Sequence, residues 1–463
     1  VGRRRRWPAR WWTLATAAAG LCALLLTGSL LWLWPREQAV AAKPAVAVLP
    51  FDALGGDEAA RRFSDGITED IIADLARFGD LDVIARNSTA AYQGKPLDVR
   101  RIGAELNVGY VVEGSIQRQG ERTRVTAQLI DARTGAHLWA NRWDRPTTDI
   151  FAVQAEVAEA VASAIGGSNS MAAVTTSRIA DAKRRPPAKL TAYEHFLLAV
   201  DGKARRTKES VRSGLEHANA AVALDPELAR AYSTRAFLHF FTTAYGGNAA
   251  EAIRRSEADA RRAVELDPRD PEAQASLAFA HAITGRLSDA RTEVLRAVRD
   301  GPANIHVLVL AANILPYAGD PEFAARYADK AQRLDPRMMP GNIGALPHAY
   351  FFTRRFDDAL AVLLRIPDES FNRRLAFLQA ATLAQLGRAA EVGPARDRLL
   401  AKYPNISAEL ALARELRVAR PQEAELILDS FRKLGLPICA KPEDLAAMDG
   451  TQRLAACHEV TTG

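Results

Sequence analysis

The sequence of 463 residues lacks the short motifs that mark most enzymes and metal-binding proteins. Its eight histidines include no HExxH pair, which excludes the zinc site of the common metalloproteases. No GxSxG segment marks a hydrolase nucleophile, and no GK(S/T) follows Gly55 and Gly56 as a phosphate-binding loop requires. We therefore expect no catalytic residue, no cofactor, no metal ligand and no enzymatic activity in this chain.

Two small groups of polar residues are candidates for a catalytic or metal-binding site. Asp65, Glu69 and Asp70 form an acidic cluster, but no cysteine or histidine accompanies them as a second type of metal ligand. We interpret them as solvated carboxylates near a helix start, where the helix dipole favours negative charge. The histidines of the later helices are interpreted as surface or packing residues: His195, His217 and His239.

Excess positive charge is scarce outside the amino terminus. The formal net charge is +6, and five arginines among the first ten residues supply most of it. The rest of the chain is close to neutral and shows no basic face of the kind that nucleic acids require. We therefore expect no nucleic-acid partner.

A long apolar run follows these arginines. Between Arg10 and Arg36 lie 25 residues without a charge, and roughly 20 apolar residues suffice to cross a bilayer. Tryptophans flank both ends, as in interfacial aromatic belts. The run predicts a transmembrane helix over residues 11–35, with a cytoplasmic basic leader over residues 1–10 and the bulk in the bacterial periplasm. The alternative is a signal peptide cleaved near residues 39–41.

A period of 34 residues runs through the second half of the chain. One series consists of prolines and the other mainly of glycines. The members are Pro268, Pro302, Pro336 and, two periods further on, Pro404, with Gly285, Gly319, Thr353 and Gly387 midway between them. This is the period of a helix-turn-helix repeat, in which the glycine region forms the turn and the proline ends the second helix. The alternative, an ordinary helical bundle, does not explain a fixed period.

The prolines also close similar phrases, namely ANAAVALDP, ARRAVELDP, LRAVRDGP and ADKAQRLDP. With small residues where two helices approach closely, these phrases resemble the tetratricopeptide repeat, without the tryptophan near its start. We expect five or six units between residues 190 and 435, with surplus residues in the turn Ala244–Glu251. The resemblance implies a solenoid that binds other proteins.

Residues 43–167 follow a different pattern, in which apolar strands alternate with amphipathic helices. The predicted order is β-α-β-α-β-β-β-α, a mixed sheet with helices. The expected strands are 45–51, 81–88, two within 110–131 joined by a turn at 119–121, and 137–145, and the expected helices are 63–78, 98–107 and 150–165.

The phrases AVLPF, FSDGITEDI, LDVIARNS, YVVEGSIQR and DIFAVQ occur in this order, and together they resemble the TolB amino-terminal-like domain. The resemblance implies a domain that often lies between a membrane helix and tetratricopeptide repeats, as in class III adenylate cyclases or winged-helix regulators. Only about ten residues precede the apolar run, far fewer than a cyclase domain needs, so we expect no cyclase activity in this polypeptide. Two hypotheses follow: a protein-binding scaffold or sensor, and the truncated sensory half of a cyclase-like or transcription-regulator signalling protein.

The first helix of each repeat unit is expected to line a concave face, where extended peptides usually lie. The predicted groove residues are mostly aromatic: Phe237, Phe240, Phe241, Phe279, Ile283, Asn313, Tyr317, Tyr350 and Phe351. Asn313 is expected to hold the backbone of an apolar or proline-containing segment. The alternative is packing between repeats, because aromatic residues at helical spacing usually belong to the core.

Two of the three cysteines, Cys439 and Cys457, fall in the expected carboxy-terminal cap, residues 436–463. In an oxidising compartment they could form a disulfide that stabilises the fold by on the order of 3 kcal/mol. Two free cysteines are the alternative. The third, Cys22, lies in the apolar run.

Together these patterns predict an α+β fold class. A single transmembrane helix precedes a small mixed α/β domain over residues 43–167, a linker over residues 168–189 and an α-helical tetratricopeptide repeat solenoid over residues 190–435. The expected partner is a protein or peptide held by the repeats. The expected location is the bacterial inner membrane, crossed once.

Overall fold

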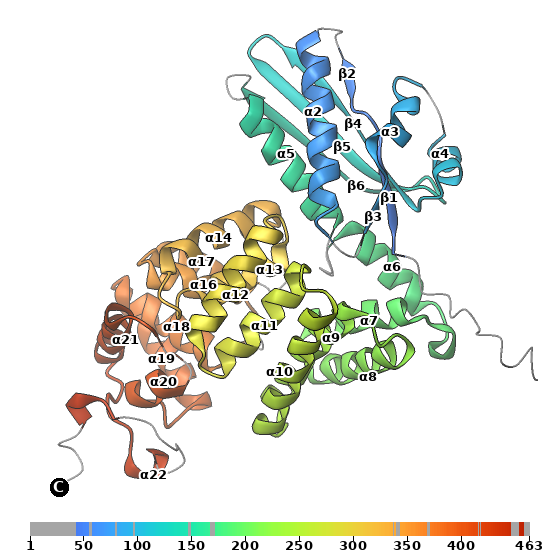
Figure 1. Cartoon of the computed structure of the whole chain (residues 1–463). Helices are drawn as coiled ribbons and strands as arrows, with labels where there is room; N and C mark the ends of the chain where they lie inside the picture. The colour runs from blue at the N-terminus through green and yellow to red at the C-terminus, as the bar shows by residue number, and fades with distance from the viewer. Residues whose placement is uncertain are drawn as a thin grey trace, which may run out of the picture. The chain divides into compact units, whose positions relative to one another are not determined.

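The computed structural model describes most of the chain between Lys43 and Cys457. The described residues are 43–54, 58–78, 81–95, 98–146, 150–166, 172–336, 338, 343–367, 371–414, 416, 418–445 and 453–457. They form a small sheet with its helices, followed along the chain by a series of helix pairs (Figure 1).

The first part of the described chain is a six-stranded mixed sheet. Its strand order is β3-β1-β4-β5-β6, and β2 also pairs with β4. β1 lies parallel to both β3 and β4, whereas β4, β5 and β6 are antiparallel neighbours. The strands are β1 (Ala45–Val48), β2 (Asp52–Leu54), β3 (Asp82–Val83), β4 (Tyr110–Gln119), β5 (Arg122–Asp131) and β6 (His137–Pro146).

The alternation of side chains along β1 separates the two faces of the sheet. Val46 and Val48 belong to the core formed with α2 and α5, which lie over one face. Ala47, between them, belongs to a smaller core on the opposite face, with Ile102 of α4. The helices of this part are α2 (Glu58–Leu75), α3 (Arg86–Thr89), the 3-10 turn η1 (Ala90–Tyr92), α4 (Val99–Leu106) and α5 (Ile150–Ile165).

The predicted order of strands and helices is confirmed, with β2 and the short α3 and η1 as additions. The strand predicted over residues 81–88 is wrong in extent, because β3 has two residues and α3 begins at Arg86. Local bonds give the physical reason. The Ser88 amide donates to the Ala85 carbonyl (3.0 Å), and the Thr89 hydroxyl donates to the Arg86 carbonyl (3.0 Å). Such bonds favour a turn over an extended strand.

The acidic cluster on α2 is engaged within the sheet domain. Asp65 and Glu69 both pair with the guanidinium of Arg86, at 2.6 Å for Asp65. Asp70 accepts a hydrogen bond from the side-chain amide of Gln154 on α5 (2.6 Å). Within the described ranges, no group of three or more His, Cys, Asp or Glu residues is placed to hold a metal ion. The side chains of Asp65 and Glu69 are exposed, as expected, but the predicted helix start is wrong, because α2 begins at Glu58 and both residues lie well inside it.

The second part of the described chain consists of helix pairs joined by short turns. From the first pair to the sixth, the first helices of successive pairs contact one another in chain order, so they form one continuous layer, here called the first-helix face. The pairs are α7 (Ala192–Arg205) with α8 (Lys208–Leu224), α9 (Ala229–Phe241) with α10 (Ala249–Leu266), α11 (Pro271–Ile283) with α12 (Leu287–Asp300), α13 (Ile305–Ile314) with α14 (Pro321–Leu334), α16 (Leu346–Phe352) with α17 (Phe356–Leu363), α18 (Arg373–Gln385) with α19 (Ala389–Lys402), and α20 (Ala408–Arg414) with α21 (Pro421–Lys433).

Shorter elements fill the connections. The segment expected as a linker, residues 168–189, contains α6, which packs against α7. The surplus residues between α9 and α10 include the turn η4, which precedes Gly246 in a left-handed conformation (φ 87°). The shorter elements are α6 (Ala173–Lys183), η3 (Pro187–Lys189), η4 (Thr242–Tyr245), α22 (Pro442–Leu445) and η6 (Ala455–Cys457).

The turns inside the pairs agree with the 34-residue period at three positions. Gly285, Gly319 and Gly387 have φ values of 83°, 92° and 69°, which glycine adopts without steric cost. The fourth expected position is wrong by one residue. Arg354 (φ 58°) is left-handed there, because α16 extends to Phe352 and Thr353 still caps it with a φ of −94°.

Close packing within a pair is clearest between α7 and α8. A Cβ atom added to Gly202 would lie 2.6 Å from the Ser210 carbonyl oxygen and 2.8 Å from the Gly214 Cα. Gly202→Ala should therefore lower the free energy of unfolding by roughly 1–3 kcal/mol, because backbone atoms must move apart. Gly393→Ala in α19 is the matched control, since a Cβ there meets no atom within 4 Å. Equal urea midpoints for the two variants would contradict this packing.

The carboxy-terminal tail docks on α20. Glu409 accepts hydrogen bonds from the amides of Ala440 (2.9 Å) and Leu454 (3.0 Å), and a disulfide joins Cys439 to Cys457 with an S–S distance of 2.02 Å. Together these contacts connect the two described parts of the tail.

The disulfide gives a direct prediction. Alkylation of the folded protein, followed by peptide mass analysis, should leave Cys439 and Cys457 unmodified until a reductant is added. Reduction should then lower the stability of the tail by about 3 kcal/mol, because the closed loop is lost. Ready alkylation of both residues without reductant would contradict the bridge.

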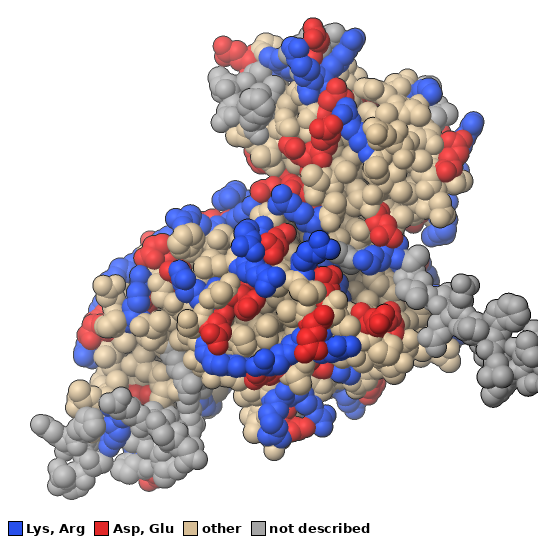
Figure 2. Space-filling view, in the orientation of Figure 1, with Lys and Arg blue, Asp and Glu red and all other residues tan. Residues whose placement is uncertain are grey.

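Charged side chains are mixed over the helix pairs. Figure 2 shows Lys and Arg interspersed with Asp and Glu on the face in view. Many are neighbours along one helix, such as Arg255 with Glu251 (2.6 Å) and Arg261 with Glu257 (2.7 Å). Exposed pairs of this kind stabilise a helix by only a few tenths of a kcal/mol.

The expected fold class and location are corrected by the structure. The described part of the chain is mainly helical, with a small amino-terminal sheet followed by helical repeats, rather than an α+β protein with one transmembrane helix. Among the described residues, no helix is both long and apolar enough to span a bilayer, so the structure does not support the expected single-pass inner-membrane protein. Residues 1–10 and the apolar run 11–35 lie outside the described residues.

Candidate functional site

The predicted groove residues divide into two classes by burial. The fully covered ones are core residues: Phe237, Tyr317, Tyr350 and Phe351. The others keep part of their surface accessible: Phe240, Phe241, Phe279, Ile283 and Asn313. The accessible aromatic residues come from α9 and α11, which are neighbours in the first-helix face.

These aromatic rings form one cluster. The ring centroid of Phe279 lies 4.9 Å from that of Phe237 and 5.0 Å from that of Phe240. Phe241 lies 6.3 Å from Phe237, and His306 of α13 meets Phe237 edge-on at 5.2 Å. Three successive first helices therefore share one aromatic surface, which is here called the aromatic cluster.

Two predicted tyrosines lie away from this cluster and use their hydroxyls internally. The Tyr317 hydroxyl hydrogen-bonds Nδ1 of the buried His348. The Tyr350 hydroxyl donates to Asp329 (2.9 Å) and accepts from the Gln332 amide (2.7 Å). Burial and the Asp329 carboxylate both raise the pKa of Tyr350 well above its usual range. These hydroxyls are therefore committed to contacts within the protein.

Positive charge lies beside the aromatic cluster. The Lys203 ammonium, on the last turn of α7, is 5.2 Å from the Phe237 ring centroid, and the Arg206 guanidinium is 4.5 Å from that of Phe241. Only 9% of Lys203 is exposed, and it has neither a hydrogen bond nor an ion pair with any described residue. Burial lowers the pKa of Lys203 to about 8, against the opposing effect of Glu272.

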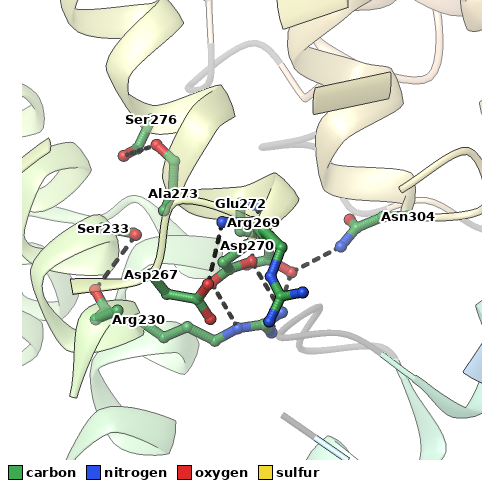
Figure 3. A network of polar contacts seen from close by, with 10 residues as sticks. Arg230, Ser233, Asp267, Arg269, Asp270, Glu272, Ala273, Ser276 and Asn304 are labelled. Atoms are coloured by element: carbon green, nitrogen blue, oxygen red, sulfur yellow. Dashed lines mark hydrogen bonds and ion pairs between the residues drawn. The ribbon is translucent and has the colours of Figure 1, made fainter. Parts of the chain in front are cut away.

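A buried ionic network joins the same three first helices, α9, α11 and α13, and Figure 3 shows its side chains. Arg230 of α9 holds Asp270 through two bonds, with Nε to Oδ2 at 3.0 Å and Nη2 to Oδ1 at 3.2 Å. Glu272 of α11 accepts from Asn304 (3.0 Å) and lies 3.5 Å from Arg230. All four side chains are at most 6% exposed.

The same residues begin the helices that they connect. Asp270 caps α11 by accepting from the Glu272 amide (2.9 Å), and Asn304 caps α13 by accepting from the His306 amide (3.0 Å). Burial alone would raise the pKa of Glu272, but the Arg230 charge and the Asn304 bond hold it well below its ordinary value. The network therefore fixes the starts of three first helices while keeping Glu272 ionised.

His306 completes the surroundings of the cluster. Burial and the nearby Lys203 charge lower the pKa of His306 well below its usual range, so its ring is neutral at physiological pH. Its Nε2 atom is buried and forms no hydrogen bond in the described part of the chain.

Sequence reasoning did not find Lys203, Arg230, Glu272, Asn304 or His306. For Asn304 a signal existed in the sequence. Asn304 and Asp270 each stand two residues after a periodic proline, so they occupy the same cap position in consecutive units. The charge partners of these caps follow no such period.

Comparisons with known proteins cover separate parts of the chain. A family model for the second domain of HilA/YgeH-like transcriptional regulators matches residues 42–159, which include the sheet. A protein of Rhizobium meliloti (strain 1021), named "Putative adenylate cyclase 3", is 48% identical over 149 residues, or 29% of this chain and 25% of that protein. The alignment thus spans about a quarter of the curated relative. Neither match covers half of the chain.

Solved structures give weaker likenesses. PilW, a widely conserved type IV pilus biogenesis factor, aligns at a TM-score of 0.33 and 15% identity over 50% of this chain and 95% of its own. PilF of Pseudomonas aeruginosa aligns at 0.33 and 16% identity over 46% and 93%. TolB from Acinetobacter baumannii aligns at 0.20 and 19% identity over 29% and 32%. Likenesses of this size say nothing about function.

Proposed function

We propose that this chain binds an extended segment of another protein on the first-helix face and acts as a scaffold or sensor. The observation that carries the proposal is the set of partly exposed rings Phe240, Phe241 and Phe279, which lie against one another on neighbouring first helices. Aromatic rings dominate the energy of most protein interfaces. Because Lys203 and Arg206 lie beside them, a segment with an apolar residue next to an acidic one fits best.

The domain organisation belongs to the same proposal. The sheet domain, residues 43–167, is taken as TolB-like, and residues 190–435 as tetratricopeptide repeats that supply the binding face. Residues 168–189 connect the two, and residues 436–463 form the cap. The order of the described helix pairs and the contacts between successive first helices support this division.

Replacing Phe240 and Phe279 together by alanine should weaken binding at least about tenfold, since each ring contributes a contact that truncation removes. A suitable ligand can be selected from a displayed library of random peptides on the full chain, and its affinity measured by fluorescence anisotropy. Phe323→Ala in α14 is the control, because this exposed ring lies on a second helix.

The helical circular dichroism of the variants must stay unchanged, so that loss of binding is not loss of fold. If Phe323→Ala weakens binding as much as the double variant, the first-helix face is not the binding site. Unchanged affinity in the double variant would lead to the same conclusion.

A second candidate function is the sensory part of a cyclase-like signalling protein. The observation that favours it is the 48% identity over 149 residues with the Rhizobium meliloti protein. Antibodies against the repeats should then precipitate from native cells a polypeptide larger than 50.3 kDa that makes cyclic AMP. A native product of 50.3 kDa without this activity would contradict it.

A further inference from the structure

A small cavity lies far along the chain from the aromatic cluster. Its volume is about 290 Å³, and it forms where the start of α14, the turn after α16 and the start of α21 meet. The side chains that matter to its chemistry are Glu322, Phe352, Arg354, Arg420, Glu423 and Leu426. The cavity therefore combines two acids, two bases and two apolar residues.

One buried acid in this cavity has an unused oxygen. Glu423 is 3% exposed, and its Oε1 accepts from Nε of Arg420 (2.9 Å). Its Oε2 is also buried but forms no hydrogen bond in the described part of the chain. A buried acceptor of this kind is costly unless a donor reaches it. The atom thus identifies where a ligand could place an N–H group.

The basic side of the cavity includes the exposed side chain of Arg354. The side chain of Arg354 forms neither a hydrogen bond nor an ion pair with any described residue, and it lines the cavity. It also occupies the left-handed turn position at which other pairs have Gly285, Gly319 and Gly387. Arg206, in the turn between α7 and α8, is another arginine with a left-handed backbone (φ 52°), so Arg354 shares this feature with the turn of the first pair.

The geometry points to a binding site for a small zwitterion of the α-amino acid class. The ligand ammonium would donate to Oε2 of Glu423, and its carboxylate would accept from Arg354. An aliphatic side chain would contact Phe352 and Leu426. A simple anion is disfavoured by the two carboxylates and a metal cation by the two guanidinia, whereas a site with balanced charge suits a ligand with balanced charge.

The test measures binding of glycine, L-alanine and L-leucine to the full chain by isothermal titration calorimetry at millimolar concentrations. At least one of them should bind with one-to-one stoichiometry. Its amide, which lacks the carboxylate, and its deaminated acid, which lacks the ammonium, should each bind at least about tenfold more weakly, because each loses a charge-assisted bond. The absence of binding by all three amino acids, or equal binding of either analogue, would overturn the proposal.

Two variants assign the atoms. Arg354→Gly removes the guanidinium, and glycine suits the left-handed turn, so the variant should fold at least as well as the parent. Glu423→Gln keeps the shape of the side chain but removes its charge. Each should weaken binding at least about tenfold, as a change in measured affinity. Parent-like affinity in Arg354→Gly, with a parent-like melting temperature, would contradict the assignment.

Discussion

Replacing Arg230 by methionine is expected to lower the free energy of unfolding by about 3–5 kcal/mol. The change leaves Asp270 and Glu272 buried without their shared cation, at 3% and 4% exposure. An uncompensated buried charge costs more than the pair gained, because the remaining carboxylates keep their desolvation penalty. Urea denaturation followed by circular dichroism measures the loss.

Two matched variants separate charge from packing. Adding Asp270→Asn and Glu272→Gln to Arg230→Met should recover most of the stability, because no buried charge then lacks a partner and asparagine still caps α11. Arg254→Met, which breaks an exposed pair with Glu251, should cost less than about 1 kcal/mol. If Arg230→Met costs no more than Arg254→Met, the network does not support the helices as described.

The stability of the repeats is expected to rise between about pH 8 and pH 10.5 because of Lys203. Burial lowers its pKa from 10.5 to about 8 in the folded state. Across this window the unfolded chain binds the proton that the folded chain has released. The free energy of unfolding therefore rises with pH, by about 3 kcal/mol in total from this one group.

Lys203→Met isolates this effect, since it removes the titrating group and keeps most of the apolar volume. The difference in unfolding free energy between parent and variant should change across the window and be constant just below it. At lower pH, Glu272 and His306 also contribute to the difference, because the Lys203 charge lowers the pKa of both. A pH-independent difference would show that Lys203 keeps its ordinary pKa.

The sequence predicts the repeats well because their signal is geometric. A turn that needs a left-handed residue selects glycine, so Gly285, Gly319 and Gly387 mark it at a fixed spacing. The same rule fails where the backbone tolerates another residue. Arg354 holds the left-handed position in place of the expected Thr353, and no glycine there shows the shift.

The sheet domain shows the limit of pattern reading on short segments. The long β4 and β5 and the helix α5 follow their predicted ranges, since ten or more residues give a clear period. Within residues 81–88, only the first few residues are apolar enough to form a strand. The local bonds of Ser88 and Thr89 then favour a turn, which apolar periodicity does not record.

The sequence predicts which helices line the proposed binding face, but not which of their side chains are accessible. The period identifies the helix that lines the face, yet a first helix also packs against its partner and both neighbours. Phe237 and Tyr350 are therefore buried, while Phe240 and Phe279 stay accessible at similar helical positions. Lys203 was not predicted because its role depends on its contact with Phe237. This contact joins two helices, and no local sequence pattern encodes it.

Site-directed photo-crosslinking tests the central claim most directly. A photoreactive phenylalanine analogue would replace Phe240 on the first-helix face or, as the control, Leu364, which is 67% exposed at the end of α17. With the selected peptide bound to the full chain, the account predicts a crosslink from position 240 and no crosslink from position 364. The crosslink from position 240 should be lost when Lys203→Met or Phe279→Ala is added. Crosslinking from position 364 alone, or from both positions equally, would contradict binding on the first-helix face.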